Sequence, residues 1–113
     1  MTEIPSGAAL DVFSNWEHHS RKLAVIGSNP SFVVSLRNAR VTICLEDQLQ
    51  LTCGGDGIVR FFVRGALFSP ADPKDFHEES AAWSAEFEPG VQIRFVNTET
   101  QCFVFPERAK TPV

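Results

Sequence analysis

Two runs of alternating apolar and polar residues flank a glycine-rich turn in the middle of the chain. The first run is Gln48–Cys53 (QLQLTC), the second is Ile58–Arg64 (IVRFFVR), and GGDG joins them. Side chains of a β-strand point alternately to the two faces of a sheet, so a period of two residues is typical of strands. The pattern predicts a β-hairpin, and this hairpin constrains the fold more than any other feature.

The length of the turn decides which faces of the two strands match. A four-residue loop would place Leu51 opposite Arg60. A three-residue loop places Leu51 opposite Val59 and Gln50 opposite Arg60, and a five-residue loop would keep the same matching of apolar faces. A three-residue hairpin requires a left-handed residue, which a glycine supplies. A phosphate-binding loop is disfavoured, because the glycines lead into a strand and no Lys-Ser or Lys-Thr follows them.

Two segments of the chain have the features of helices. Residues 6–19 place their apolar side chains at i, i+3, i+4 and i+7 of one helical face: Ala9, Val12, Phe13 and Trp16. Ser6 is the expected N-cap of this helix. A second, short helix is expected near residues 73–81, because Asp72 and Pro73 form a typical helix start.

The remaining chain consists of short apolar runs separated by turn residues. Further strands are expected at residues 23–26, 31–37, 40–46, 91–97 and 101–105, with extended chain after residue 81 and a tight hairpin loop at Asn38 and Ala39. Such short connections favour antiparallel neighbours. The sequence therefore predicts a mostly β (α+β) fold in a single domain, residues 1–113. We expect a curved antiparallel sheet or small partly open barrel of seven or eight short strands, with the N-terminal helix and the short second helix. The alternative is a flat sheet with both helices on one face.

Composition and charge argue against several classes of partner. The formal net charge is −4 and no run of basic residues occurs, which disfavours a nucleic-acid-binding protein on electrostatic grounds. No apolar run reaches the length of a membrane span, and the first twenty residues lack the pattern of a signal peptide. Cys44, Cys53 and Cys102 form no CxxC motif, so we expect reduced thiols in a cytoplasmic protein.

Residues suited to catalysis or metal binding are sparse. His18 and His19 are adjacent and would point about 100° apart on a helix. No HxxxH, HxH or HExxH spacing occurs, so we expect no metal and no cofactor. His77 lies among acidic residues, and a metal-assisted enzyme built around it is the least favoured functional hypothesis.

Arginines, glutamines and one phenylalanine share the face of the predicted sheet that lies opposite the apolar one. The residues of this face that we consider for ligand binding are Arg40, Gln50, Arg60, Phe62 and Arg64. Arg offers bidentate hydrogen bonds to an anion and Phe offers a stacking surface, so a small anionic ligand is one hypothesis. Arg and aromatic residues are also enriched at subunit interfaces, and an ordinary solvated face is the third possibility.

The leading hypothesis is a non-catalytic domain that acts through self-association or protein interaction, most simply as a homodimer. Residues 31–36 and 101–105 are apolar runs without a charged residue. If either run were an exposed edge strand, it would need to be paired or covered. The interface residues expected on this basis are Phe32, Phe103 and Phe105.

Overall fold

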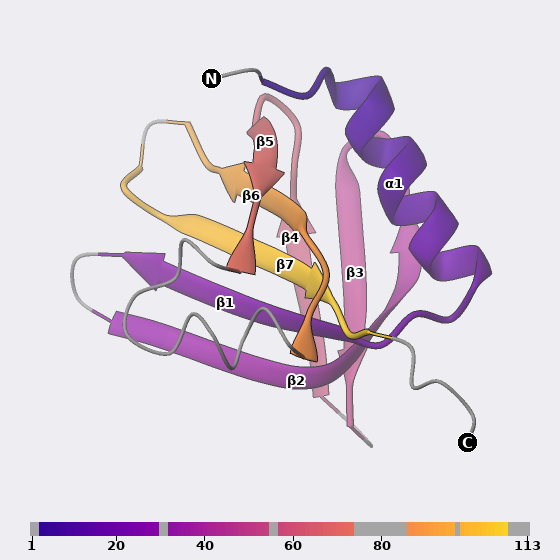
Figure 1. Cartoon of the computed structure of the whole chain (residues 1–113). Coiled ribbons are helices and arrows are strands. Elements are labelled where there is room, and N and C mark those ends of the chain that lie inside the picture. Colours follow the sequence, from indigo (N-terminus) through magenta and orange to yellow (C-terminus); the bar gives the residue numbers. More distant parts are fainter. Residues whose placement is uncertain (1–2, 30–31, 55–56, 74–85, 97, 109–113) are drawn as a thin grey trace, which may run out of the picture.

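The protein folds into one N-terminal helix and an open sheet of seven antiparallel strands in the part of the chain that the structure describes (Figure 1). The structure is a computed structural model, and it describes residues 3–29, 32–54, 57–73, 86–96 and 98–108. Its elements are α1 (Ser6–His18), β1 (Leu23–Asn29), β2 (Phe32–Cys44), β3 (Gln48–Cys53), β4 (Gly57–Phe62), β5 (Leu67–Ala71), β6 (Gly90–Arg94) and β7 (Gln101–Pro106). The predicted fold class, a curved mostly β sheet with an N-terminal helix, is confirmed. The predicted second helix lies outside the described residues, apart from Pro73.

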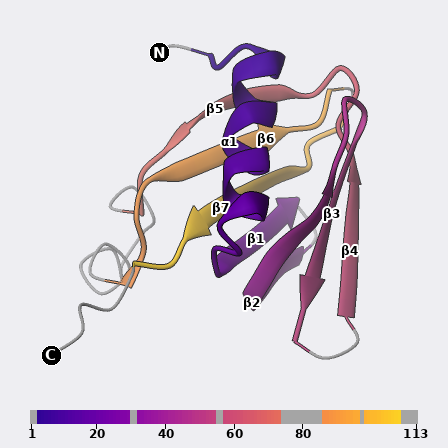
Figure 2. The same ribbon diagram turned by 90° about the vertical axis from the view of Figure 1, so that its right-hand side faces the viewer.

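The sheet is built from two meanders that meet at its centre. The strand order is β4-β3-β2-β1-β7-β6-β5, so β1 pairs with β7 and the two edges are β4 and β5. Residues 63–66 connect these two edge strands directly and span roughly 18 Å at most. Seven strands laid flat would separate the edges by about 29 Å. The sheet must therefore curl, and Figure 2 shows its two halves inclined toward each other.

The hairpin of β3 and β4 has the register that the alternation of residues predicts. Leu51 lies opposite Val59, and Gln50 lies opposite Arg60. Cys53 pairs with Gly57, which leaves a loop of three residues. Gly54 has a φ of 62°, so it occupies the left-handed position that such a loop requires. The predicted matching of the apolar faces is confirmed, and of the two loop lengths that allow it the structure has the three-residue one.

The hairpin expected at Asn38 and Ala39 is wrong, because β2 continues through both residues. Leu23 pairs with Ala39, but Val25 pairs with Leu36, so β2 has one extra residue opposite β1. Asn38 adopts a φ of 58° at this bulge. Asn tolerates left-handed backbone in bulges as well as in tight turns, which is why the local signal was ambiguous.

Two further details of the elements differ from the prediction. The strand β5 was not expected, since Pro70 removes a backbone donor; at the edge of a sheet this loss is tolerated. Ser6 is not the N-cap of α1. Pro5 occupies that position without a side-chain hydrogen bond, and Ser6 is the first helical residue.

Two hydrophobic clusters lie on opposite faces of the sheet. On the inner face, α1 covers the sheet with Ala9, Phe13 and Trp16 (Figure 2). The ring of Phe13 meets those of Trp16 and Phe68 edge-on, at centroid distances of 5.6 and 6.0 Å. The outer face has a smaller cluster at the centre of the sheet: Ala24, Ile26, Phe87 and Phe105.

Candidate functional site

A row of hydrogen-bonded polar side chains crosses the outer face of β2, β3 and β4. The Nε and Nη2 atoms of Arg60 donate to Oε1 of Gln50 at 3.2 and 2.9 Å. Nε2 of Gln50 donates to Oγ1 of Thr42 at 3.3 Å, and Oγ1 of Thr52 donates to the same oxygen at 3.3 Å. We call Thr42, Gln50, Thr52 and Arg60 the polar ladder. Its order follows from register, because Gln50 and Arg60 are directly opposed.

The structure brings four of the five proposed ligand-binding residues onto this face. Gln50 and Arg60 are in contact, and Phe62 follows Arg60 on the same side of β4 with 69% of its surface exposed. Arg40 lies opposite Thr52 in the register of β2 and β3. Arg64 is separate from this group: it follows the end of β4, and its Nη2 atom lies 3.7 Å from Oδ2 of Asp47.

The positive charge of Arg60 has only neutral partners among the described residues. The ion pairs found there involve Arg21, Arg37 and Arg64, and none includes Arg60. Its hydrogen-bond acceptor is the amide oxygen of Gln50. The ladder thus orients the guanidinium, and no carboxylate of the described residues forms an ion pair with it.

The two edges of the sheet differ in how they are protected. At β5, the backbone N–H of Ile4 donates to the carbonyl of Phe68 at 2.8 Å, and Pro70 removes a donor. At β4, no described residue pairs with the side that faces away from β3. Ile58 and Phe62 of β4 are 61% and 69% exposed. The bare edge of β4 therefore combines unpaired backbone with apolar side chains.

A hollow of about 380 Å³ lies between β4 and the connection from β6 to β7. Its wall includes Phe61 and Phe95, whose ring centroids are 6.0 Å apart, and Thr98 and Thr100. Arg60 and Phe62 also contribute to its lining. Sequence reasoning missed this hollow. Phe61 and Phe95 come from different meanders, and no local pattern shows that curling of the sheet brings them together.

The interface expected at β2 and β7 rested on a wrong assumption about the edges. Both strands are interior: β2 lies between β1 and β3, and β7 lies between β1 and β6. Phe105 is fully buried in the outer-face cluster, and Phe103 stacks on it at a centroid distance of 6.4 Å. The side chain of Phe32 lies outside the described part of the structure. Apolar runs without charge are typical of both edge and central strands, so composition alone did not distinguish them.

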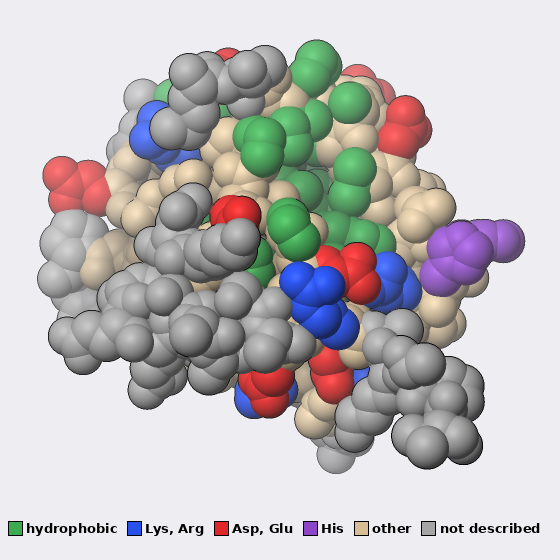
Figure 3. All heavy atoms as spheres, in the orientation of Figure 1, with side chains coloured by type: hydrophobic (Ala, Val, Ile, Leu, Met, Phe, Trp, Pro, Cys, Tyr) green, Lys and Arg blue, Asp and Glu red, His purple; other side chains and the backbone are tan. Residues whose placement is uncertain are grey.

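The described histidines lie at the C-terminal end of α1. His18 and His19 are exposed, with ring centroids 5.1 Å apart, and Figure 3 shows them projecting from the surface. His77 lies outside the described residues. Within the described ranges, no group of three or more His, Cys, Asp or Glu side chains is placed to hold a metal ion.

The three cysteines are free thiols, and burial makes each of them a weaker acid. Desolvation raises the pKa of Cys102 to about 12. Desolvation also raises the pKa of Cys44, with a smaller contribution from the carboxylates of Glu17 and Asp11, and it raises the pKa of Cys53. A reactive cysteine requires a lowered pKa, so none of these thiols has the environment of a nucleophile.

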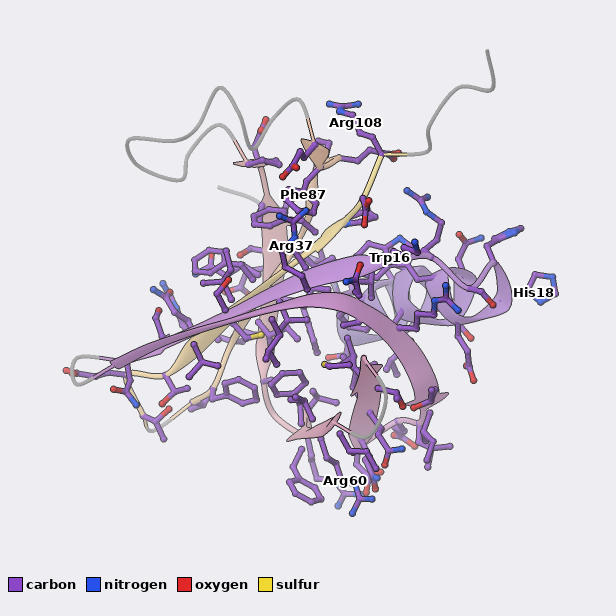
Figure 4. All side chains as sticks on the ribbon, turned by 90° about the horizontal axis from the view of Figure 1, so that it is seen from below. Trp16, His18, Arg37, Arg60, Phe87 and Arg108 are labelled. Atoms are coloured by element: carbon purple, nitrogen blue, oxygen red, sulfur yellow. The ribbon has the colours of Figure 1, made fainter. Side chains whose placement is uncertain are left out.

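Two other arginines hold the segment around Phe87 against the sheet. The guanidinium carbon of Arg37 lies 5.1 Å from the centroid of the Phe87 ring, and its Nη2 atom lies 3.3 Å from Glu86. Arg21 pairs with Glu88 at 3.0 Å. Figure 4 shows Arg37 beside Phe87 and far from Arg60. Both guanidinium groups therefore have acidic partners within the chain.

Comparison with protein-family models, with curated proteins and with solved structures finds no match to this chain. Among the helical residues that the structure describes, none forms a helix long and apolar enough to cross a membrane. The features that bear on function are therefore the bare edge of β4, the polar ladder and the hollow.

Proposed function

We propose that this protein is a non-catalytic interaction domain that adds an extended segment of a partner protein to the bare edge of β4. One observation carries the proposal. Among the described residues, no strand pairs with the edge of β4 that faces away from β3, whereas Ile4 and Pro70 protect the edge formed by β5. Addition of a strand to a sheet edge is a common mode of peptide recognition, in which backbone hydrogen bonds supply affinity.

The exposed side chains of β4 support the same role. Ile58, Arg60 and Phe62 occupy every second position of the six-residue strand, so all three side chains lie on its outer face. Natural edge strands are usually shortened, charged or covered, and a strand that exposes two large apolar residues is prone to pair with another chain. An added strand would cover both residues and satisfy the backbone groups of the edge.

Charge favours a different protein over a second copy of this chain as the occupant. In a two-fold antiparallel pair centred on Arg60, residues 58–62 of the two copies would align and the two Arg60 side chains would face each other. Like charges directly opposite in a sheet are destabilising by roughly 0.2–1 kcal/mol. An acidic residue of a partner would instead form an ion pair with Arg60. Since the three cysteines are free thiols, we place this interaction in the cytoplasm.

Peptide selection combined with amide hydrogen exchange tests the proposal. Random peptides of about ten residues, long enough to span β4, are displayed on phage and selected against the intact chain. At a peptide concentration of 100 Kd, mass action predicts about a hundredfold slower exchange of the edge amides of β4. Selected peptides that leave exchange in residues 57–62 unchanged, or a selection that yields no binder, would refute the proposal.

A pair of matched variants distinguishes peptide binding at the edge of β4 from nonspecific binding to exposed apolar residues. Ile58→Lys adds a charge at the bare edge, and Val34→Lys adds the same charge at an exposed residue of the interior strand β2. We expect only Ile58→Lys to weaken peptide binding. Light scattering on the same proteins tests self-association. A dimer that Ile58→Lys disrupts and Val34→Lys does not would assign a second copy as the occupant and contradict the preference based on charge.

A small anionic ligand is a second candidate, favoured by two features of Arg60: it has no acidic partner among the described residues, and it shares a side of β4 with the exposed ring of Phe62. Benzoate combines a carboxylate with an aromatic ring, and benzyl alcohol lacks the charge. If this candidate is right, benzoate alone shifts the NMR signals of the polar ladder, and Arg60→Gln abolishes the shift. Equal effects of the two compounds would exclude it.

A further inference from the structure

We infer that the partner segment is recognised through two adjacent side chains: an acidic residue opposite Arg60 on the outer face, and a large apolar residue that enters the hollow beside Phe61 and Phe95. This inference rests on the proposed function, because it specifies the strand that the edge of β4 would accept. It defines the partner by a short sequence pattern, an acidic residue next to a large apolar one.

The outer-face position is specified by the orientation of Arg60. Two N–H groups of its guanidinium donate to the amide oxygen of Gln50 on β3, which fixes the position of the group. A guanidinium has five N–H donors, so three remain for a partner. A residue directly opposite in a neighbouring strand has its Cβ about 4.5–5.5 Å away, within reach of a carboxylate. Asp or Glu is the side chain that this position favours.

The inner-face position follows from the alternation of side chains. The residue next to the acidic one points to the inner face and lies opposite Phe61 or Val59. Phe61 borders the hollow of about 380 Å³ that lies along the edge of β4, between this strand, Phe95 and the connection from β6 to β7. A large aromatic or aliphatic side chain would fill this space and pack on two phenylalanine rings.

The two positions belong together because the hollow and the bare edge are on the same strand. Arg60 and Phe61 are consecutive residues of β4, and both line the hollow. Within the described ranges, the opposite edge offers no equivalent. A smaller hollow of about 260 Å³ adjoins Phe68 of β5, but the backbone of Ile4 already pairs there. The side chains that would recognise a partner therefore lie on β4, the same strand whose edge has backbone groups available for pairing.

The selected peptides test this pattern directly. We expect an acidic residue adjacent to Phe, Trp, Leu or Met to be enriched. In a selected peptide, replacement of the large apolar residue by Ala should weaken binding by about thirtyfold, as for a buried anchor at an interface. Replacement of its acidic residue by Gln should weaken binding by about two- to fivefold, as for an exposed ion pair. Changes in the peptide cannot unfold the domain.

A double-mutant cycle assigns the acidic position to Arg60. With Arg60→Gln, the acidic and amide forms of the peptide should bind equally, whereas Arg40→Gln, another exposed arginine of the outer face, should preserve the difference. Peptides that slow exchange in β4 but lack the acidic–apolar pair, or show no coupling to Arg60, would overturn this inference and leave strand addition intact. Failure to find any peptide that protects β4 would overturn both.

Discussion

Replacement of Gly90 by Ala should destabilise the protein strongly, because the backbone of β7 leaves no room for a side chain there. A Cβ atom at Gly90 would overlap the carbonyl oxygen of Val104 and would lie 2.9 Å from its carbonyl carbon and 3.0 Å from Cα of Phe105. These are backbone atoms of an interior strand, paired on both sides. A flexible side chain could rotate away from the added methyl group, but this backbone cannot.

The expected loss in the free energy of unfolding can be bounded by comparison with a glycine that has open space around it. Overpacking in a core costs about 1–3 kcal/mol, and a clash with fixed backbone belongs at the upper end of that range. Gly27 of β1 provides the control, since an added Cβ there has nothing within 4 Å. Because Ala restricts the unfolded chain more than Gly does, Gly27→Ala should be neutral or stabilising by up to about 1 kcal/mol.

Urea unfolding followed by tryptophan fluorescence measures both variants, because Trp16 is buried in the inner core. We expect the free energy of unfolding of Gly90→Ala to be lower than that of Gly27→Ala by about 3 kcal/mol, at unchanged m-values. If the two variants differ by less than about 0.5 kcal/mol, the close approach of β6 to β7 is not as described. The pairing at the C-terminal half of the sheet would then need revision.

Three further predictions concern the helix, the bulge and the buried thiol. Phe13→Ala should lower the free energy of unfolding by about 3–5 kcal/mol in the same urea assay, because its ring is fully buried between α1 and the sheet; a loss below about 1 kcal/mol would mean that α1 does not cover the inner face. Asn38→Gly should be nearly neutral and Asn38→Val clearly destabilising, since φ is 58° at this bulge; equal stabilities would contradict the left-handed assignment. The pKa of Cys102 rises from 9.0 to about 12 on folding, so the unfolded chain loses this proton first as pH increases. Its contribution to stability is complete below about pH 9 and falls by about 1.4 kcal/mol per pH unit up to about pH 12; Cys102→Ala should remove this part of the alkaline loss, and an unchanged slope would show that the thiol is not buried.

The sequence was sufficient to predict features that depend on residues close together in the chain. The register of β3 and β4 followed from side-chain alternation and loop length, which together place Gln50 opposite Arg60. The helical face of α1 followed from the spacing of its apolar residues. In both cases the physical constraint acts within about twenty residues, so a local pattern contains it.

Features that depend on distant pairing could not be predicted in this way. Asn38 is a residue type that tolerates a left-handed backbone, which is found both in tight turns and in bulges. Only the pairing of β2 with β1 shows that it lies in a bulge. The run around Phe105 was apolar and uncharged, and nothing local showed that it pairs at the centre of the sheet. The hollow beside Phe61 exists because residues 63–66 force the sheet to curl, a requirement that appears only once the strand order is known.

The pairing of β1 with β7 has a consequence for how the protein is made. Each meander consists of strands that are neighbours in sequence. The pairing of β1 with β7 instead joins residues 23–28 to residues 101–106, which are separated by most of the chain. Such non-local pairing slows folding, since the entropy of a long loop must be lost before its contacts form. During synthesis on the ribosome, the first meander emerges with one side of β1, including the apolar run from Leu23 to Ile26, still unpaired. Until β7 has been synthesised, the nascent chain exposes this edge of β1 in addition to the edge of β4, and transiently exposed strand edges make a folding chain prone to aggregation.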